Sequence, residues 1–284
     1  MCRFFSYLGN ATLMLDAMYH AENSLVEQSK CAKKRRSPVN GDGFGIGWYP
    51  THDDPEPGCY VSTKPAWSDQ NLLSLCSKIK TACYFAHVRD ASVGMSVSST
   101  NCHPFRMGSY LWMHNGELKQ FYRIKRAVIN ELSDRAFLQI RGSTDSEFVF
   151  ALFLDEIQFN YQASLEELQA ALINTMQKIK RIEQACEVSE SSFMNFVVSN
   201  GHCLISTRYS TNKSVQPPSL FYSTAQMEVG RSGQLFLHQN EKNSSVIITS
   251  EPITDDKKFW HKVERNQMII VNAELKIKTK DLSF

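Results

Sequence analysis

The sequence lacks the features that mark several large classes of protein. Its 284 residues carry 31 Lys and Arg against 29 Asp and Glu, a formal net charge of only +2. Without a strong positive field, the chain is not expected to seek nucleic acid or an anionic membrane surface. No run approaches the roughly 18 apolar residues that a membrane-spanning helix needs. The opening MCRFFSYLGN has neither the long apolar stretch nor the cleavage site of a secretory signal.

The sequence also lacks paired cysteines. No two of its eight cysteines form a CxxC, and Cys102–His103 and His202–Cys203 are the only adjacent Cys and His residues. Disulfide frameworks belong to small secreted chains, and structural zinc sites need closely spaced ligand pairs. We therefore expect free thiols, a reducing cytoplasmic environment and no bound metal. The cysteine count alone keeps a zinc or redox protein open as an alternative.

Strand and helix patterns fall into clusters along the chain. Helical patterns cover residues 11–21, 68–80, 146–159 and 164–188, and Thr144 and Glu147 have the spacing of a capping box before the third of these. Short apolar strands are expected over residues 2–8, 41–49, 82–88 and 108–113, and through most of the final third. Such clusters predict an α+β fold with large sheets covered by helices, in one domain.

Cys2 has two interpretations. It is either a buried strand cysteine or a nucleophile that becomes the first residue once Met1 is removed. In the second case one residue carries a thiol and a free α-amine, whose pKa of about 7.7–8.0 suits a base near neutral pH.

His114-Asn115-Gly116 follows an apolar strand, and Asn-Gly is ordinarily a turn. The alternative is an oxyanion site, with a donor from the Asn115 side chain and one from the Gly116 backbone. Glycine permits the close backbone approach that such a site needs.

Arg89 and Asp145 are the two charged candidates. Arg89 ends an apolar strand and is either an ordinary strand-end charge or a bidentate partner for a carboxylate. Asp145 either complements the dipole of a helix at its first turn or holds a substrate ammonium. Together they would recognise both charges of an amino-acid head group, although no spacing rule shows that they meet.

Two further stretches point away from nucleotides and nucleic acid. The basic run from Lys30 to Arg36 has no interleaved aromatic residues, so a solvated loop is favoured, and a contact of Arg35 or Arg36 with an acidic substrate stays open. GDGFGIG has the spacing of neither the dinucleotide fingerprint nor the P-loop, so no cofactor is expected.

Taken in order, the motifs resemble the class II glutamine amidotransferases of the N-terminal-nucleophile hydrolase superfamily. These motifs are MCRFFSYLG, NGDGFGIGWY, AHVRDASVG, CHPF with HNGEL, STDSE, NFVVSNGHCLISTRY and ITSEP with Trp260, and they span nearly the whole chain. The sequence is most similar to the stand-alone branch of γ-glutamyl amidohydrolases, which acts in glutathione degradation and ergothioneine synthesis.

The resemblance implies a four-layer αββα sandwich over residues 2–284 and hydrolysis of a small γ-glutamyl amide, with release of glutamate through a thioester on Cys2. By position, Asn115 and Gly116 would form the oxyanion hole, Arg89 would hold the α-carboxylate and Asp145 the α-ammonium. The resemblance also leaves open a protein partner, which would be either a peptidase or a synthase subunit.

The chain departs from the family pattern next to the arginine. Asp90 and Val93 stand where synthase-type members carry Trp and His, and Ser92 replaces threonine. These changes fit an amine leaving group other than ammonia. A glutaminase subunit that delivers ammonia to a separate synthase, and a non-catalytic regulatory protein of the same fold, remain alternatives.

Overall fold

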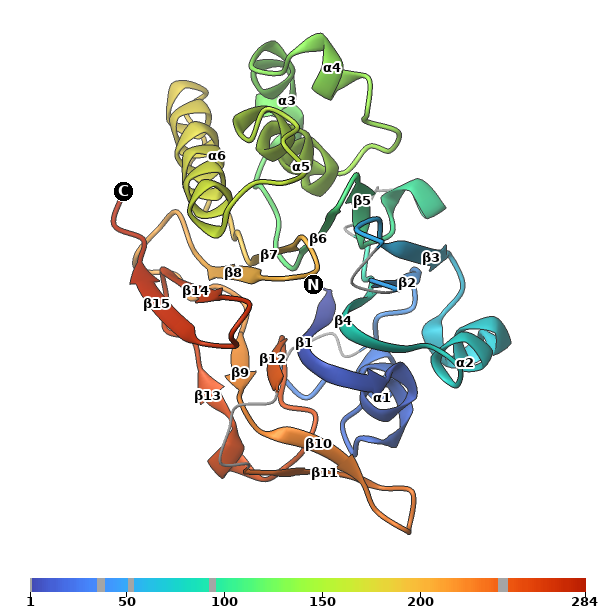
Figure 1. Ribbon diagram of the computed structural model, residues 1–284. Coiled ribbons are helices and arrows are strands. Elements are labelled where there is room, and N and C mark those ends of the chain that lie inside the picture. The colour runs from blue at the N-terminus through green and yellow to red at the C-terminus, as the bar shows by residue number, and fades with distance from the viewer. Residues whose placement is uncertain (1, 35–38, 51–53, 92–95, 240–244) are drawn as a thin grey trace.

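Two antiparallel sheets lie face to face in the computed structural model, and helices cover the outer face of each (Figure 1). The structure describes residues 2–34, 39–50, 54–91, 96–239 and 245–284. This arrangement confirms the predicted α+β fold and the four-layer αββα sandwich. Among the described residues, no helix has the length and apolar character needed to cross a bilayer.

Sheet A contains both the start of the chain and strands from its last quarter. In spatial order it consists of β13 (His261–Lys262), β9 (Phe221–Ser223), β12 (Ser245–Thr249), β1 (Arg3–Leu13), β4 (Lys80–Val88), β2 (Phe44–Trp48) and β3 (Gly58–Ser62). Strand β1 therefore lies in the middle of the sheet, between β12 and β4.

Sheet B is built from the middle and the end of the chain. Its order is β15 (Ile277–Asp281), β14 (Gln267–Val271), β8 (Leu204–Arg208), β7 (Phe196–Ser199), β6 (Tyr110–His114) and β5 (Phe105–Met107). A separate hairpin pairs β10 (Gln226–Val229) with β11 (Leu235–His238).

The helices form the two outer layers. Sheet B is covered by α3 (Phe121–Asn130), α4 (Asp134–Phe137), α5 (Asp145–Glu156) and α6 (Leu165–Ala185) (Figure 1). Sheet A is covered by α1 (Leu25–Lys30), α2 (Gln70–Cys76), the π-helix η1 (Asp16–His20) and the β10–β11 hairpin. Short 3₁₀ turns are η2 (Ala66–Ser68), η3 (Ser99–Asn101) and η4 (Lys257–Phe259).

Alternating side chains on β6 show how one strand serves two apolar layers. Leu111 and Met113 pack in the core between the sheets, whereas Tyr110 and Trp112 pack against the helices on the other side. Successive side chains of a strand point to opposite faces, so a continuous apolar run is needed where both faces are buried.

The two longest helices begin where the sequence predicts. Ser164 and Glu167 form a complete capping box at the start of α6. At α5, Thr144 accepts a hydrogen bond from the Glu147 amide, but the Glu147 carboxylate turns to the backbone amides of Arg141 and Gly142. The helix therefore keeps its cap but not the reciprocal half of the box.

The predicted helix over residues 11–21 is wrong at its start. Strand β1 passes through a register shift after Leu8 and pairs with β4 again at Thr12 and Leu13. Hydrogen bonding to a neighbouring strand outweighs the helical pattern there, and the chain is helical only from Met14 to His20. Helix α3 was not predicted, because its buried stripe consists of just Ile124 and Val128.

Candidate active site

Cys2 lies directly before β1, beside the end of β4. The register that pairs Arg3 with Val88 brings Cys2 next to the residues that follow β4. The backbone amide of Asp90 lies 3.5 Å from the Cys2 sulfur. A central strand thus carries the thiol into the interior of the sandwich, while Cys2 keeps some exposed surface.

The surroundings keep the Cys2 thiol protonated. Burial raises the pKa of this thiol above its ordinary value, although the hydrogen bond from Asp90 and the positive charge of Arg89 oppose the rise. Because the thiolate is the nucleophile, a base must remove the proton when the sulfur attacks.

Arg89 is buried beside this thiol. Its side chain is 4% exposed, and its Nη atoms donate to the carbonyl oxygens of Asp42 at 3.4 Å and Ser96 at 3.3 Å. Among the described residues no carboxylate pairs with it. A buried guanidinium held by two long bonds to carbonyls is suited to receive an anionic group.

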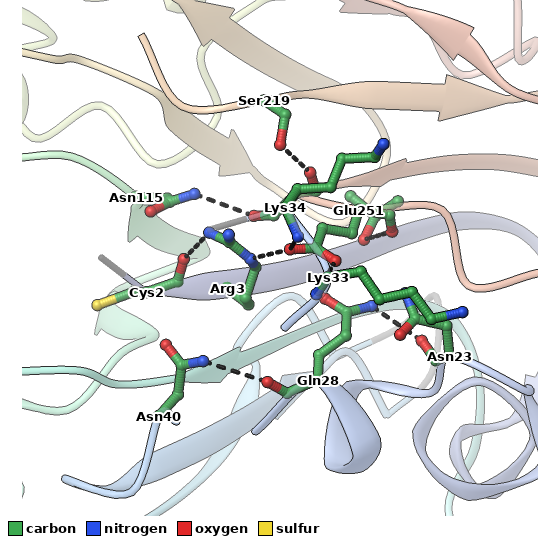
Figure 2. A network of polar contacts seen from close by, with 12 residues as sticks. Cys2, Arg3, Asn23, Gln28, Lys33, Lys34, Asn40, Asn115, Ser219 and Glu251 are labelled. Atoms are coloured by element: carbon green, nitrogen blue, oxygen red, sulfur yellow. Dashed lines mark hydrogen bonds and ion pairs between the residues drawn. The ribbon is translucent and has the colours of Figure 1, made fainter. Parts of the chain in front are cut away.

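Asn115 approaches Cys2 from the opposite sheet. It follows β6, its amide donates to the Asn195 carbonyl at 2.9 Å, and its Nδ2 donates to Ser250 Oγ at 3.1 Å. The same Ser250 oxygen accepts the Phe4 amide at 3.0 Å, so one hydroxyl joins Asn115 to the strand of the nucleophile. Figure 2 shows Cys2 and Asn115 at the same end of the polar network.

Gly116 is packed too tightly for any side chain. A Cβ atom at this position would overlap the Phe193 carbonyl and the His114 ring. Glycine is therefore required by close approach, and its backbone stays beside Asn115.

Asp145 is tied to the same loop from the start of α5. One carboxylate oxygen accepts the Leu118 amide at 2.6 Å, and the other accepts the Ser146 amide at 2.8 Å. The structure thus places Arg89 and Asp90 beside Cys2, joins Asn115 through Ser250 to Phe4, and places Asp145 against the loop three residues beyond Asn115. No direct contact joins Asp145 to Cys2 or Arg89 among the described residues.

Sequence reasoning did not identify three buried histidines around the site. The rings of His87 and His103 lie 4.4 Å apart, and His87 Nε2 lies 3.3 Å from the His114 carbonyl. Burial lowers the pKa of His87 to about 3 and also lowers the pKa values of His103 and His114. Lowered pKa values make these rings poor bases; His87 and His114 hydrogen-bond around the Asn115 loop, and His103 packs against the His87 ring. The three histidines belong to the motifs AHVR, CHPF and HNG, and these motifs could have marked them as site residues.

Arg3 and Glu251 form a second feature that sequence reasoning missed. Arg3 Nε lies 2.7 Å from Glu251 Oε1, and Arg3 Nη1 donates to the Cys2 carbonyl at 2.8 Å (Figure 2). The Glu251 carboxylate also accepts the backbone amides of Lys33 and Lys34, both at 2.9 Å. The basic run is therefore anchored beside Cys2 by its backbone, whereas Arg35 and Arg36 lie outside the described residues, as do Met1, Ser92 and Val93.

Within the described part of the chain, no three His, Cys, Asp or Glu side chains are grouped so as to hold a metal ion. The site is therefore built from a thiol, a guanidinium, a carboxamide, backbone amides and a carboxylate. Such a set suits acyl transfer from a small zwitterionic substrate.

Comparisons with known proteins agree with this chemistry. A sequence profile described as glutamine amidotransferases class-II matches residues 13–281. A probable glutamine amidotransferase, DUG3, of Saccharomyces cerevisiae is 33% identical over 96% of this chain and 82% of its own length. The γ-glutamyl-hercynylcysteine sulfoxide hydrolase of Mycolicibacterium smegmatis is 24% identical over 90% of this chain and 89% of its own.

Solved structures share the fold. A glutamine aminotransferase class-II domain protein of Silicibacter pomeroyi superimposes with a TM-score of 0.67 at 23% identity, covering 99% of this chain and all of that one. Glutamine phosphoribosylpyrophosphate amidotransferase of B. subtilis gives 0.61 at 18% identity, over 99% of this chain and 49% of that one. The chain belongs to the class II glutamine amidotransferases, a family of amide-hydrolysing enzymes.

Proposed function

We propose that the protein hydrolyses a γ-glutamyl amide through a thioester on Cys2 and releases glutamate. One observation carries the proposal: a half-buried thiol precedes β1, a buried guanidinium that pairs with no carboxylate among the described residues follows β4, and a buried carboxamide follows β6 and is tied through Ser250 to the strand of the thiol. Each of the three has a task in cleaving an amide of an amino-acid side chain.

The reaction begins at Cys2. Removal of Met1 frees the α-amine of Cys2, which takes the thiol proton directly or through water as the sulfur attacks the γ-carbonyl carbon. Asn115 and the backbone amide of Gly116 donate to the oxyanion that forms. The intermediate collapses to a thioester, and the leaving amine departs with the proton from the α-ammonium. Water then attacks the thioester and returns the thiol.

The head group of the substrate is bound by charge. Arg89 takes the α-carboxylate, in place of the carbonyls that it now contacts at 3.3 and 3.4 Å. Asp145 takes the α-ammonium, since the carboxylate is held by two backbone amides and keeps lone pairs for a further donor. These two charges select a free glutamyl head group.

The leaving group is an amine larger than ammonia, as in glutathione or a related γ-glutamyl compound. Two observations support this: Asp90 follows the arginine, and one relative is named as a hydrolase of a γ-glutamyl compound. Residues 2–284 act as one catalytic domain, since sheet A joins β1 to β13 and sheet B joins β5 to β15.

A substrate panel tests the proposal. Purified protein, shown by intact mass to begin at Cys2, is given glutamine, glutathione and γ-glutamylalanine, and glutamate release is measured beside a Cys2→Ala control. We expect faster turnover of γ-glutamyl peptides than of glutamine, and none in the control. Faster glutamine turnover would indicate a glutaminase instead. Glutamate release by Cys2→Ala, or full activity with Met1 retained, would contradict the mechanism.

A further inference from the structure

Asn115 and Ser250 form a contact between the two sheets in which one acceptor and one donor lack hydrogen-bond partners among the described residues. Asn115 and Ser250 are both completely buried, and Asn115 Nδ2 lies 3.1 Å from Ser250 Oγ. Asn115 Oδ1 has no hydrogen-bond partner within the described chain. A buried carbonyl oxygen without a donor is costly in a protein interior.

The Ser250 hydroxyl lacks an acceptor for its proton in the described part of the chain. Its oxygen accepts from the Phe4 amide at 3.0 Å and from Asn115 Nδ2, so it accepts twice. No acceptor for its own proton is found among the residues that the structure describes. A hydroxyl carries one donor and two acceptor lone pairs, so here the donor is unused.

A half-turn of the Asn115 carboxamide gives both Oδ1 and the Ser250 hydroxyl proton a partner. The turn exchanges Oδ1 and Nδ2, which have nearly the same size and shape. The Ser250 hydroxyl then donates to Asn115 Oδ1 and still accepts from the Phe4 amide. Nδ2 moves to the place of the buried oxygen that had no partner among the described residues, so Nδ2 becomes the group that needs an acceptor, which the substrate oxyanion supplies under the proposed function.

We infer that Ser250 is a positioning residue for the reaction: its hydroxyl proton selects the orientation of Asn115 in which Nδ2 faces the substrate oxyanion. The inference rests on the proposed function, because it assumes that Asn115 is an oxyanion donor. A donor aimed in advance stabilises the developing charge without reorganising during the reaction.

The position of Ser250 in the fold supports this role. Ser250 follows β12, and its amide donates to the Phe4 carbonyl at 3.0 Å, while the Phe4 amide donates to its side chain. Phe4 is two residues from Cys2, so Ser250 fixes Asn115 relative to the strand of the nucleophile. Ser250 therefore fixes the position of the oxyanion donor on sheet B relative to the thiol on sheet A.

A double-mutant cycle tests the inference with the substrate turned over fastest in the panel. Asn115→Ala should lower kcat by about 100- to 1,000-fold, as loss of an oxyanion donor does. Ser250→Ala should lower kcat by about 10-fold or more with KM unchanged, because the orientation of a transition-state donor is lost. In the Asn115→Ala background, Ser250→Ala should have no further effect on kcat.

Three results would overturn the inference. Ser250→Ala could leave kcat unchanged, raise KM instead, or lower kcat by the same factor with and without Asn115. Ser206→Ala is the control for removal of a buried serine hydroxyl, because Ser206 is also completely buried but lies in β8 and donates to the Phe196 carbonyl, at 2.9 Å. It should retain full kcat.

A second variant keeps the test usable if Ser250→Ala does not fold, since alanine leaves the Phe4 amide without its acceptor. Ser250→Cys has similar volume and a weak S–H donor, so its kcat should fall between that of the natural protein and that of Asn115→Ala. The reduction must again vanish in the Asn115→Ala background. If Cys2→Ala retains activity, the proposed function fails; if only the Ser250 cycle is additive, this inference alone fails.

Discussion

Glu183 gives the most quantitative prediction, because it is a buried acid that holds the end of the active-site loop. It is 4% exposed on α6 and accepts a hydrogen bond from the Ser192 hydroxyl. The Ser192 oxygen in turn accepts the amide of Lys119, four residues after Asn115. Burial raises the pKa of the Glu183 carboxyl from 4.5 to about 7.

This rise makes stability depend on pH in a defined direction. The folded state binds the Glu183 proton more tightly than the unfolded chain, so the gain is complete below about pH 4.5 and is lost as the pH rises through 7. A pKa rise of this size corresponds to at most about 3 kcal/mol of the free energy of unfolding. Glu183→Gln removes the ionisation and keeps the shape.

Urea unfolding between pH 4.5 and 8.5 measures the effect. The free energy of unfolding of Glu183→Gln minus that of the natural protein should increase with pH, most steeply between 5 and 7, by up to about 3 kcal/mol. Glu166→Gln, an exposed change on the same helix, serves as the control and should give a small difference. A Glu183 difference that is flat with pH, or that falls, would refute the reasoning.

Three further predictions concern the site itself. Gly116→Ala should lower kcat by at least about 100-fold, since a Cβ there overlaps the Phe193 carbonyl and shifts the oxyanion loop; wild-type kinetics would contradict this account. Glu251→Ala should lower the free energy of unfolding by about 3–5 kcal/mol in urea titrations because it breaks the buried Arg3–Glu251 ion pair, and an added Arg3→Met change should recover part of the loss. Arg89→Met should reduce kcat/KM for γ-glutamyl substrates by about 10- to 100-fold, in line with loss of a charge-assisted hydrogen bond, and an unchanged value would exclude the carboxylate contact.

Local features of the fold followed from the sequence, because local rules determine them. The cap residues Thr144 and Ser164 mark the starts of α5 and α6, and the apolar run before His114 is a strand buried on both faces. The helix expected from residue 11 begins only at Met14, because the residues before it pair with β4, a strand about 70 positions away that local rules do not foresee. Helix α3 has too narrow a buried face for periodicity to detect.

The candidate site was predictable only in part. Residue chemistry and the family resemblance selected Cys2, Arg89 and Asn115, but no spacing in the sequence shows that these residues meet. The contacts that support these site residues join positions that are even further apart in the sequence. Arg3 and Glu251 are 248 positions apart and meet because β1 and β12 are neighbours in sheet A, whereas Asn115 and Ser250 are 135 apart and meet through the packing of the two sheets.

The identity of the nucleophile is tested most directly by trapping it. The mature protein is incubated with 6-diazo-5-oxo-L-norleucine, a glutamine-shaped diazoketone whose diazomethyl carbon, next to the ketone that replaces the γ-amide carbonyl, alkylates a thiol with loss of dinitrogen. Digested peptides are then mapped by mass spectrometry. The account predicts a single adduct on Cys2, loss of glutamate release in proportion to labelling, and protection by substrate. Labelling of any of the other seven cysteines in step with inactivation, or full activity with Cys2 completely modified, would contradict it.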